Sequence, residues 1–268
     1  MSIWLAFPLV LLAFIVICYI GWRSFAGGTE GAWYDPSDLT TLFQDSPGTT
    51  PVTTAGQPVG LMLDKSGNGN HATQAISAKR PIYTEGSGLS WLAFDGVDDA
   101  MATAAIDFTD TDKVSVFVGV RRLDETVRII AELSSKAGGH AGAFYLVSGI
   151  DIGFTAYSSL GRGEASVTGG QITGFSAASP GTDVVSVTHN IAGDLSTIRV
   201  NGVAGTSGTS DKGAGNFGNY PLFIGAREAS SIFFNGNLYG LIVPGKLASA
   251  DEIAATEAYM AAKPGVTL

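Results

Sequence analysis

The segment LDKSGNGNHATQ at residues 63–74 places oxygen-bearing side chains at alternate positions. Asp64, Asn68 and Asn70 offer a carboxylate and two amide carbonyls, and glycines stand between them. Calcium takes about six to eight oxygen ligands of these kinds. An EF-hand is nevertheless excluded, because the twelfth position counted from Asp64 is Ala75 instead of the required Glu, and no helices flank the loop.

Two interpretations of this loop remain open. In the first, Asp64, Asn68 and Asn70 bind calcium together with one carboxylate of FDGVDD at residues 94–99, which is Asp95, Asp98 or Asp99 and for which we take Asp98. In the second, Asp64 and Asn68 accept hydrogen bonds from their own backbone in a tight surface turn, and the glycines adopt positive φ. The cofactor prediction is therefore Ca²⁺, with a structural turn as its alternative.

A second loop, DKGAGNFGNY at residues 211–220, combines aromatic and amide side chains. Aromatic rings stack on the apolar face of a sugar, and amides hydrogen-bond its hydroxyls. We predict that Asn216, Phe217, Asn219 and Tyr220 contact a ligand. The alternative is that the two rings belong to the core.

Known catalytic patterns are missing. GAGNFG at 213–218 has dinucleotide-loop spacing but follows a polar run and opens no helix, and GLIVPGKL at 240–247 lacks the Ser or Thr of a P-loop. Glycoside hydrolysis needs two carboxylates that flank one bond, and Glu125 and Glu132 have irregular spacing for that. We therefore predict a protein that is not an enzyme.

Short strands must position these loops. The chain has 36 glycines among 268 residues, and it is 45% hydrophobic and only 15% charged. The segment 113–120 has valine at every second position, the segments 183–190, 195–205, 220–226 and 233–245 also have the composition of strands, and Asn201-Gly202 is a strong hairpin signal. Strands at this spacing, without helices between them, predict an all-β, two-sheet antiparallel jelly-roll sandwich.

One short helix closes the chain. Ser249 and Glu252 form a capping-box pattern, Ile253, Thr256 and Met260 share one helical face, and Lys263-Pro264 ends the segment. This pattern predicts a C-terminal helix packed on the sandwich.

The N-terminal segment differs from the rest. Residues 1–22 contain no charged side chain, and this apolar segment is long enough for one membrane span. We therefore assign residues 1–25 to a hydrophobic, transmembrane-like helix. Residues 26–32 are then a linker, and 33–268 form the sandwich. A cleaved signal peptide and a helix buried in an assembly are the alternatives.

The net charge of −9 argues against a general nucleic-acid binder, because phosphate neutralisation requires clustered Lys and Arg and the sequence has no basic stripe. The single cysteine, Cys18, excludes an intrachain disulfide.

Four segments carry a resemblance: LDKSGNGNHATQ, LAFDGVDDAMAT, STIRVNGVAG and FNGNLYGLIVPGKLASADEIAATEAYM. Together they resemble the laminin-G-like branch of the concanavalin-A-like lectin/glucanase superfamily. The opening at 31–74 is similar to a segment of tailed-phage and prophage virion proteins. The resemblance covers about residues 31–265 and implies a jelly roll, calcium near its loops, and binding of glycans or protein surfaces.

The resulting functional prediction is a non-enzymatic phage virion protein for structure or attachment. Its partners would be a host surface glycan or neighbouring virion proteins, the membrane through the N-terminal helix, and further copies of itself as a homo-oligomer. The first alternative is a carbohydrate-binding protein anchored in a bacterial cell envelope. The second is a glycan-cleaving enzyme.

Overall fold

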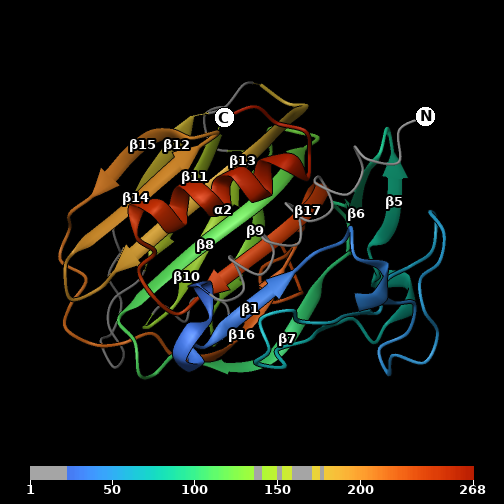
Figure 1. The fold of residues 1–268 in the computed structure, drawn as a ribbon, viewed down its shortest axis with the longest axis horizontal. Coiled ribbons are helices and arrows are strands. Elements are labelled where there is room, and N and C mark those ends of the chain that lie inside the picture. The colour runs from blue at the N-terminus through green and yellow to red at the C-terminus, as the bar shows by residue number, and fades with distance from the viewer. Residues whose placement is uncertain (1–22, 136–140, 150–152, 159–170, 176–177) are drawn as a thin grey trace, which may run out of the picture.

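In the part of the chain that the structure describes, two antiparallel sheets form a sandwich with a C-terminal helix on its outside (Figure 1). The structure is a computed structural model, and it describes residues 23–135, 141–149, 153–158, 171–175 and 178–268. Every strand pairing within these residues is antiparallel. The predicted all-β jelly-roll sandwich is confirmed.

The eight-stranded sheet has the order β15-β14-β13-β8-β17-β6-β5, with β1 paired to β17. Its strands are β1 (Gly31–Tyr34), β5 (Ile82–Gly86), β6 (Leu89–Asp95), β8 (Lys113–Arg122), β13 (Gly181–Asn190), β14 (Leu195–Val200), β15 (Val203–Gly208) and β17 (Asn235–Pro244).

The nine-stranded sheet has the order β12-β11-β10-β9-β16-β7-β4-β3-β2. Its strands are β2 (Leu42–Phe43), β3 (Leu61–Met62), β4 (Ala72–Thr73), β7 (Met101–Asp107), β9 (Arg128–Leu133), β10 (Phe144–Ser148), β11 (Gly153–Ser158), β12 (Gln171–Phe175) and β16 (Asn219–Ile224). Three short 3₁₀ helices, η1 (Ala26–Gly28), η2 (Leu39–Thr41) and η3 (Ser77–Lys79), lie in the connections.

The main core lies between the sheets. The alternating valines of β8 supply it, because side chains on a strand point alternately to its two faces. Val116, Val118 and Val120 are buried in this core, whereas Phe117 points to the outside of the eight-stranded sheet. The hairpin at Asn201-Gly202 joins β14 to β15 as predicted, with both residues at positive φ.

Helix α2 (Ala250–Ala262) covers the outer face that Phe117 occupies (Figure 1). The predicted capping box is confirmed: the Ser249 hydroxyl accepts from the Glu252 N–H, and the Glu252 carboxylate accepts from the Ser249 N–H. Thr256 and Met260 are buried and Ile253 is half-buried, so the predicted face is the one that packs.

Strand β1 is tied to α2 by a buried ionic cluster. The Asp35 carboxylate accepts from the Lys263 ammonium at 2.8 Å, from the Lys65 ammonium at 3.3 Å and from the Tyr259 hydroxyl at 2.9 Å. Burial opposes ionisation of this carboxyl, but the combined effect of the two ammonium groups is larger and lowers its pKa to about 2.

The predicted hydrophobic helix falls almost entirely on residues 1–22, which lie outside the described residues. Within the part of the chain that the structure describes, no helix is long and apolar enough to span a membrane. The segment predicted as a linker, 26–32, contains η1 and the first residues of β1.

Candidate functional site

Asp64, the first residue of the predicted calcium loop, has both carboxylate oxygens engaged by the protein. One oxygen accepts from the backbone N–H groups of Trp33 and Ser66, each at 2.8 Å. The other accepts from the Ser66 hydroxyl at 2.6 Å and from the Asn70 N–H at 3.0 Å. Gly67 and Gly69 have φ of 94° and 80°. For Asp64 and the two glycines this is the geometry of the turn interpretation, since four donors surround the carboxylate. Asn68 differs from that interpretation, because its side-chain amide donates to carbonyls outside the loop.

The two asparagines of the loop hold the segment at residues 29–31. The Asn68 side-chain amide donates to the carbonyls of Thr29 and Gly31, each at 3.1 Å. The Asn70 amide donates to the Glu30 carboxylate at 2.6 Å and to the Gly31 carbonyl at 2.8 Å. The loop at 63–74 therefore fixes the segment 29–31 in place.

The second predicted loop does the same for another segment. Asn216 donates from its side chain to the Thr109 carbonyl at 2.7 Å. The Phe217 N–H donates to the Thr111 carbonyl at 2.9 Å, and Asn219 pairs with Asp107 between β16 and β7. The loop at 211–220 thus fixes residues 107–111.

The rings of this second loop do not form a sugar platform. Phe217 is fully buried and meets Phe144 edge-on, with ring centroids 6.4 Å apart, so the core interpretation holds for it. Tyr220 is half-buried, and its hydroxyl donates to the Ala141 carbonyl at 2.9 Å. Among the four residues predicted here, Asn219 is the one with an exposed side chain.

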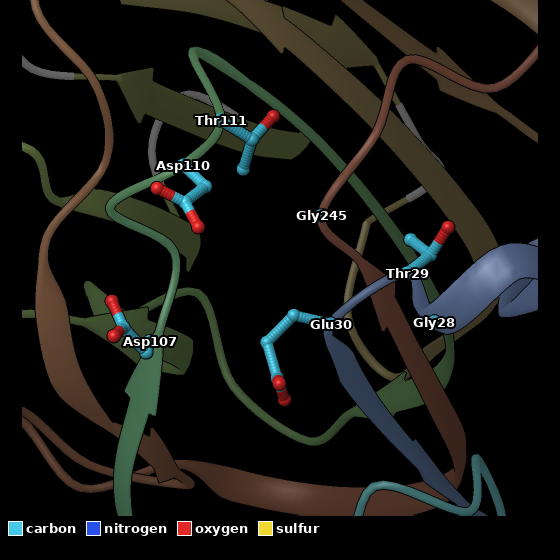
Figure 2. Close-up of a pocket in the computed structure, with 7 residues that line it drawn as sticks. All are labelled: Gly28, Thr29, Glu30, Asp107, Asp110, Thr111 and Gly245. Atoms are coloured by element: carbon cyan, nitrogen blue, oxygen red, sulfur yellow. The ribbon is translucent and has the colours of Figure 1, made fainter.

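A pocket of about 380 Å³ lies between the two held segments (Figure 2). In the figure Thr29 and Glu30 face Asp107, Asp110 and Thr111 across the hollow, and the backbone of Gly245 passes beside them. The lining consists of Gly28, Thr29, Glu30, Asp107, Asp110, Thr111 and Gly245. Both loops that the sequence singled out therefore meet at one pocket. They hold the segments that line it, and their own residues are not part of the lining.

The pocket is strongly acidic. Three of its seven lining residues are carboxylates, and neither Lys nor Arg is among them. Carboxylates accept hydrogen bonds and repel anions. The pocket can therefore receive hydroxyl or ammonium groups, and it disfavours ligands that carry a negative charge.

The pocket carboxylates were missed in the sequence because Glu30 is far along the chain from the segment that carries Asp107 and Asp110, and neither segment has a recognisable motif. The available signal was indirect. Asn70 and Asn216 were each recognised as polar residues of a constrained loop, and each of them holds one wall of the pocket.

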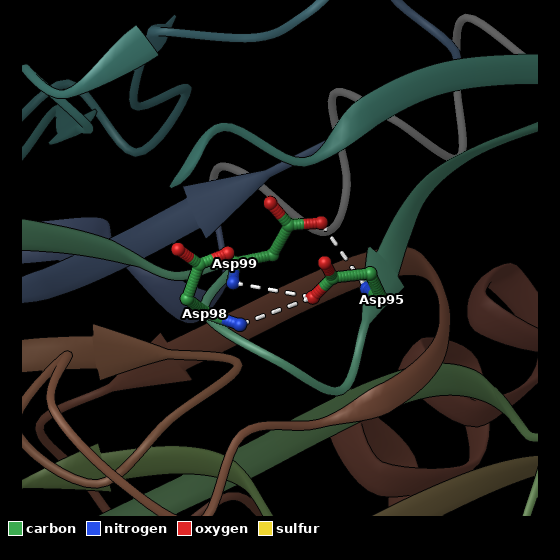
Figure 3. Close-up of side chains that lie close together, drawn as sticks. All are labelled: Asp95, Asp98 and Asp99. Carbon is green, nitrogen blue, oxygen red and sulfur yellow. Dashed lines mark hydrogen bonds between the residues drawn. The ribbon is translucent and has the colours of Figure 1, made fainter. Parts of the chain in front are cut away.

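The predicted Asp98 belongs to a separate group of carboxylates (Figure 3). Oxygen atoms of Asp95, Asp98 and Asp99 lie within 4.8 Å of one another, and this group does not include Asp64. One oxygen of Asp95 accepts from the N–H groups of Asp98 and Asp99, and Asp99 accepts from the Asp95 N–H at 3.1 Å.

Charge repulsion is concentrated on Asp99, which is almost fully buried. Burial raises the pKa of its carboxyl to about 6, and the neighbouring Asp95 and Asp98 charges raise it as well. A divalent cation would relieve this repulsion, and three carboxylates are ligands that calcium accepts. The donor set of this group therefore fits calcium.

No family model matches the chain, and no curated protein matches it. Solved structures do match, but at low sequence identity. An arabinofuranosidase complexed with arabinofuranosyl-α-1,2-xylobiose has a TM-score of 0.59 at 15% identity, over 92% of this chain and 65% of that one. The binding domain of botulinum neurotoxin serotype D has a TM-score of 0.57 at 9% identity, over 86% of this chain and 52% of that one.

The sialidase of Trypanosoma rangeli, in complex with the inhibitor DANA, has a TM-score of 0.53 at 10% identity. The match covers 94% of this chain and 38% of the sialidase. The shared feature is the lectin-like jelly-roll fold. This chain spans from about a third to two thirds of the length of these three proteins, so it corresponds to part of each of them.

Proposed function

We propose that this chain is a non-enzymatic, lectin-like binding protein that holds a glycan in the acidic pocket between Glu30 and Asp110. The observation that carries the proposal is the convergence of both loops, 63–74 and 211–220, on the two walls of that pocket. A site whose walls are fixed by hydrogen bonds before the ligand arrives loses little entropy on binding.

The charge of the pocket defines the class of glycan. Carboxylates accept hydrogen bonds from sugar hydroxyls, and they attract the ammonium group of an amino sugar. Sialylated and sulfated glycans carry negative charge, which the pocket and the net charge of −9 both repel. The proposed ligand is therefore a neutral or amine-bearing glycan.

Calcium remains part of the proposal, at Asp95, Asp98 and Asp99 instead of Asp64. Those three residues would hold the ion, and the ion would supply charge that fixes the loop between β6 and β7. The support is the mutual repulsion of the three carboxylates, together with the engagement of every Asp64 oxygen by the protein.

The wider role that we propose is display of the sandwich on a phage virion for attachment or assembly, as a laminin-G-like domain. A carbohydrate-binding protein of the bacterial envelope is the alternative. The support is the resemblance of the loop and strand segments in the sequence, which extends over the whole described sandwich.

A glycan array probed with the full-length protein tests the binding function. We expect signals on neutral or amine-bearing glycans and weaker signals on their sialylated and sulfated counterparts. Asp110→Asn should weaken the strongest signal about tenfold, which corresponds to about 1.4 kcal/mol. Asp251→Asn, which removes an exposed carboxylate on α2, should leave it unchanged.

Binding confined to sialylated or sulfated glycans, or unchanged in Asp110→Asn, would contradict the proposed site. Release of sugars from any bound glycan during the assay would contradict the non-enzymatic part of the proposal.

A further inference from the structure

A second group of polar side chains lies on the outer face of the nine-stranded sheet. Tyr145 on β10 is directly paired with Glu132 on β9, so both side chains point to the same face. Tyr145 packs with Ile129 and Val147 in a small cluster separate from the main core. Glu132 is fully buried although it is charged in its ordinary state.

The loop between β16 and β17 supplies two more groups. The Arg227 guanidinium carbon lies 5.4 Å from the centroid of the Tyr145 ring. Arg227 pairs with Ser231 across a tight turn, and the Ile232 carbonyl accepts from the Ile129 N–H at 3.1 Å. These contacts dock the loop at 227–232 onto β9.

Three buried polar atoms of this group have no hydrogen-bond partner. They are one carboxylate oxygen of Glu132, the Nε of Arg227 and one carboxylate oxygen of Glu228. The other Glu132 oxygen accepts from the Ser134 hydroxyl. Leaving a buried polar atom unpaired costs about 1–3 kcal/mol. Such atoms in one cluster indicate a place for groups that the protein itself does not supply.

The loop that carries two of these atoms is held in an unfavourable backbone conformation. Glu228, Ala229 and Ile232 have φ of 50°, 52° and 50°. A left-handed residue other than glycine costs about 1–3 kcal/mol, and the cost is most unusual for β-branched Ile. Strain of this kind gathers where a protein holds groups ready for a ligand.

The free atoms define the ligand. The two carboxylate oxygens accept a hydrogen bond, and the Arg227 Nε–H donates one. A hydroxyl group both donates and accepts, so neighbouring hydroxyls satisfy all three atoms. An anionic ligand would meet two carboxyl groups, and a cationic ligand would meet the guanidinium. Arg227 and Glu228 are half-buried, so the group meets the surface where their loop lies on the sheet.

We propose that Glu132, Arg227 and Glu228 form a second binding site, on the outer face of the nine-stranded sheet, for a neutral sugar. This site is independent of the acidic pocket and goes beyond the function proposed above. Phe223 on β16 is the register partner of Glu132 on its other side. The register therefore places the aromatic residues Phe223 and Tyr145 on either side of Glu132, in one row across neighbouring strands.

Burial raises the pKa of Glu132 to about 7, against the lowering effects of the Ser134 hydroxyl and of Arg227, and the Glu228 charge adds to the rise. Near neutral pH the carboxyl is therefore present in both states. In both of them its unpaired oxygen can take part in a hydrogen bond with a hydroxyl.

The test is NMR spectroscopy of the full-length protein with ¹⁵N-labelled arginine, titrated with D-glucose, D-galactose and N-acetyl-D-glucosamine. The Arg227 Nε–H signal is assigned by its loss in Arg227→Lys. At least one of the sugars should shift that signal along a saturating curve. Two substitutions, Glu132→Gln and Glu228→Gln in the docked loop, should each lower the affinity for the sugar, measured from this curve, about tenfold or more. Asp110→Asn, in the acidic pocket, should leave it unchanged.

A signal that none of the sugars shifts, or that shifts linearly without saturation, would overturn the proposal and leave ordered water as the partner of these atoms. Equal affinity for the sugar in the wild-type protein and in a folded Glu228→Gln variant would overturn the proposal as well. Because the two sites have separate variants, failure here is distinguishable from failure of the acidic pocket.

Discussion

At the scale of single residues, the described part of the chain contains carboxylates whose ionisation the fold controls in opposite directions. Asp35 is buried and paired with two ammonium groups, which lower its pKa to about 2. Burial of Asp99, together with the two carboxylates beside it, raises its pKa to about 6. The Asp35 arrangement stabilises the folded chain at neutral pH. The Asp99 arrangement lowers the stability of the folded chain, and a bound cation would remove this loss.

Asp35 should make the protein sensitive to acid. Its folded pKa is below the unfolded value, so its stabilisation is fully present above about pH 4 and is lost as the pH falls towards 2. The pKa difference corresponds to about 2 kcal/mol. Denaturation with urea at a series of pH values should show this loss, and Asp35→Asn should remove most of it. An unchanged acid profile in Asp35→Asn would contradict the assignment.

Asp99 should behave in the opposite way. Because its folded pKa is raised, the native state holds the proton more tightly, and stability falls as the pH rises from about 4 to 6. Asp99→Asn should therefore raise the free energy of unfolding at pH 7.5 by roughly 1–2 kcal/mol, after allowance for solvent screening. At pH 4 the variant should match the wild type.

Calcium gives a second readout at the same residues. If the ion binds there, calcium should raise the melting temperature of the wild type and EDTA should reverse the effect, since a ligand of the folded state stabilises it. Asp99→Asn should lose the response, whereas Asp64→Asn should keep it. If the calcium-dependent rise in melting temperature is lost in Asp64→Asn and kept in Asp99→Asn, the calcium site lies in the loop at 63–74 instead.

At the scale of elements, the walls of the pocket depend on close contact with Gly245, which directly follows β17. A Cβ added at Gly245 would lie 2.7 Å from the Phe108 ring and 3.1 Å from the Glu30 carbonyl oxygen. Gly245→Ala should lower the free energy of unfolding by about 1–3 kcal/mol and weaken glycan binding. The matched control is Gly119→Ala in β8, whose Cβ finds its nearest neighbours at an ordinary 3.5 Å. Equal stability of the two variants would contradict this packing.

Helix α2 offers a simpler test. Ser249→Ala removes the hydroxyl that caps the first turn and should cost about 1 kcal/mol in chemical denaturation. Ser249→Asp keeps an accepting oxygen and should retain most of the stability. If both substitutions cost the same, the cap does not stabilise the helix in the way described.

The elements also show what sequence patterns reveal. Strands β8, β13, β14, β16 and β17 and the capped helix were predictable, because period-two valines, Asn-Gly turns and capping boxes are local signals. Strands β2, β3 and β4 were not, since they have two residues each and depend on pairing with distant segments. The same limit applies to the acidic pocket, whose walls come from residues about 80 positions apart in the sequence.

At the scale of the whole molecule, the sandwich supports the two proposed binding sites. The core between the sheets holds β7 and β17 in position, and the loops at 63–74 and 211–220 fix the pocket segments against them. Phe217 illustrates how one residue serves this arrangement: its ring fills the core, and its backbone N–H holds the Thr111 carbonyl at the pocket wall.

The most direct test of the account is a crystal structure of the protein with the oligosaccharide that binds best on the array. The account predicts sugar hydroxyls or an amine within hydrogen-bond distance of Glu30 and Asp110, with the loops at 63–74 and 211–220 unmoved. A sugar bound elsewhere on the sandwich, with the acidic pocket filled only by water, would contradict it.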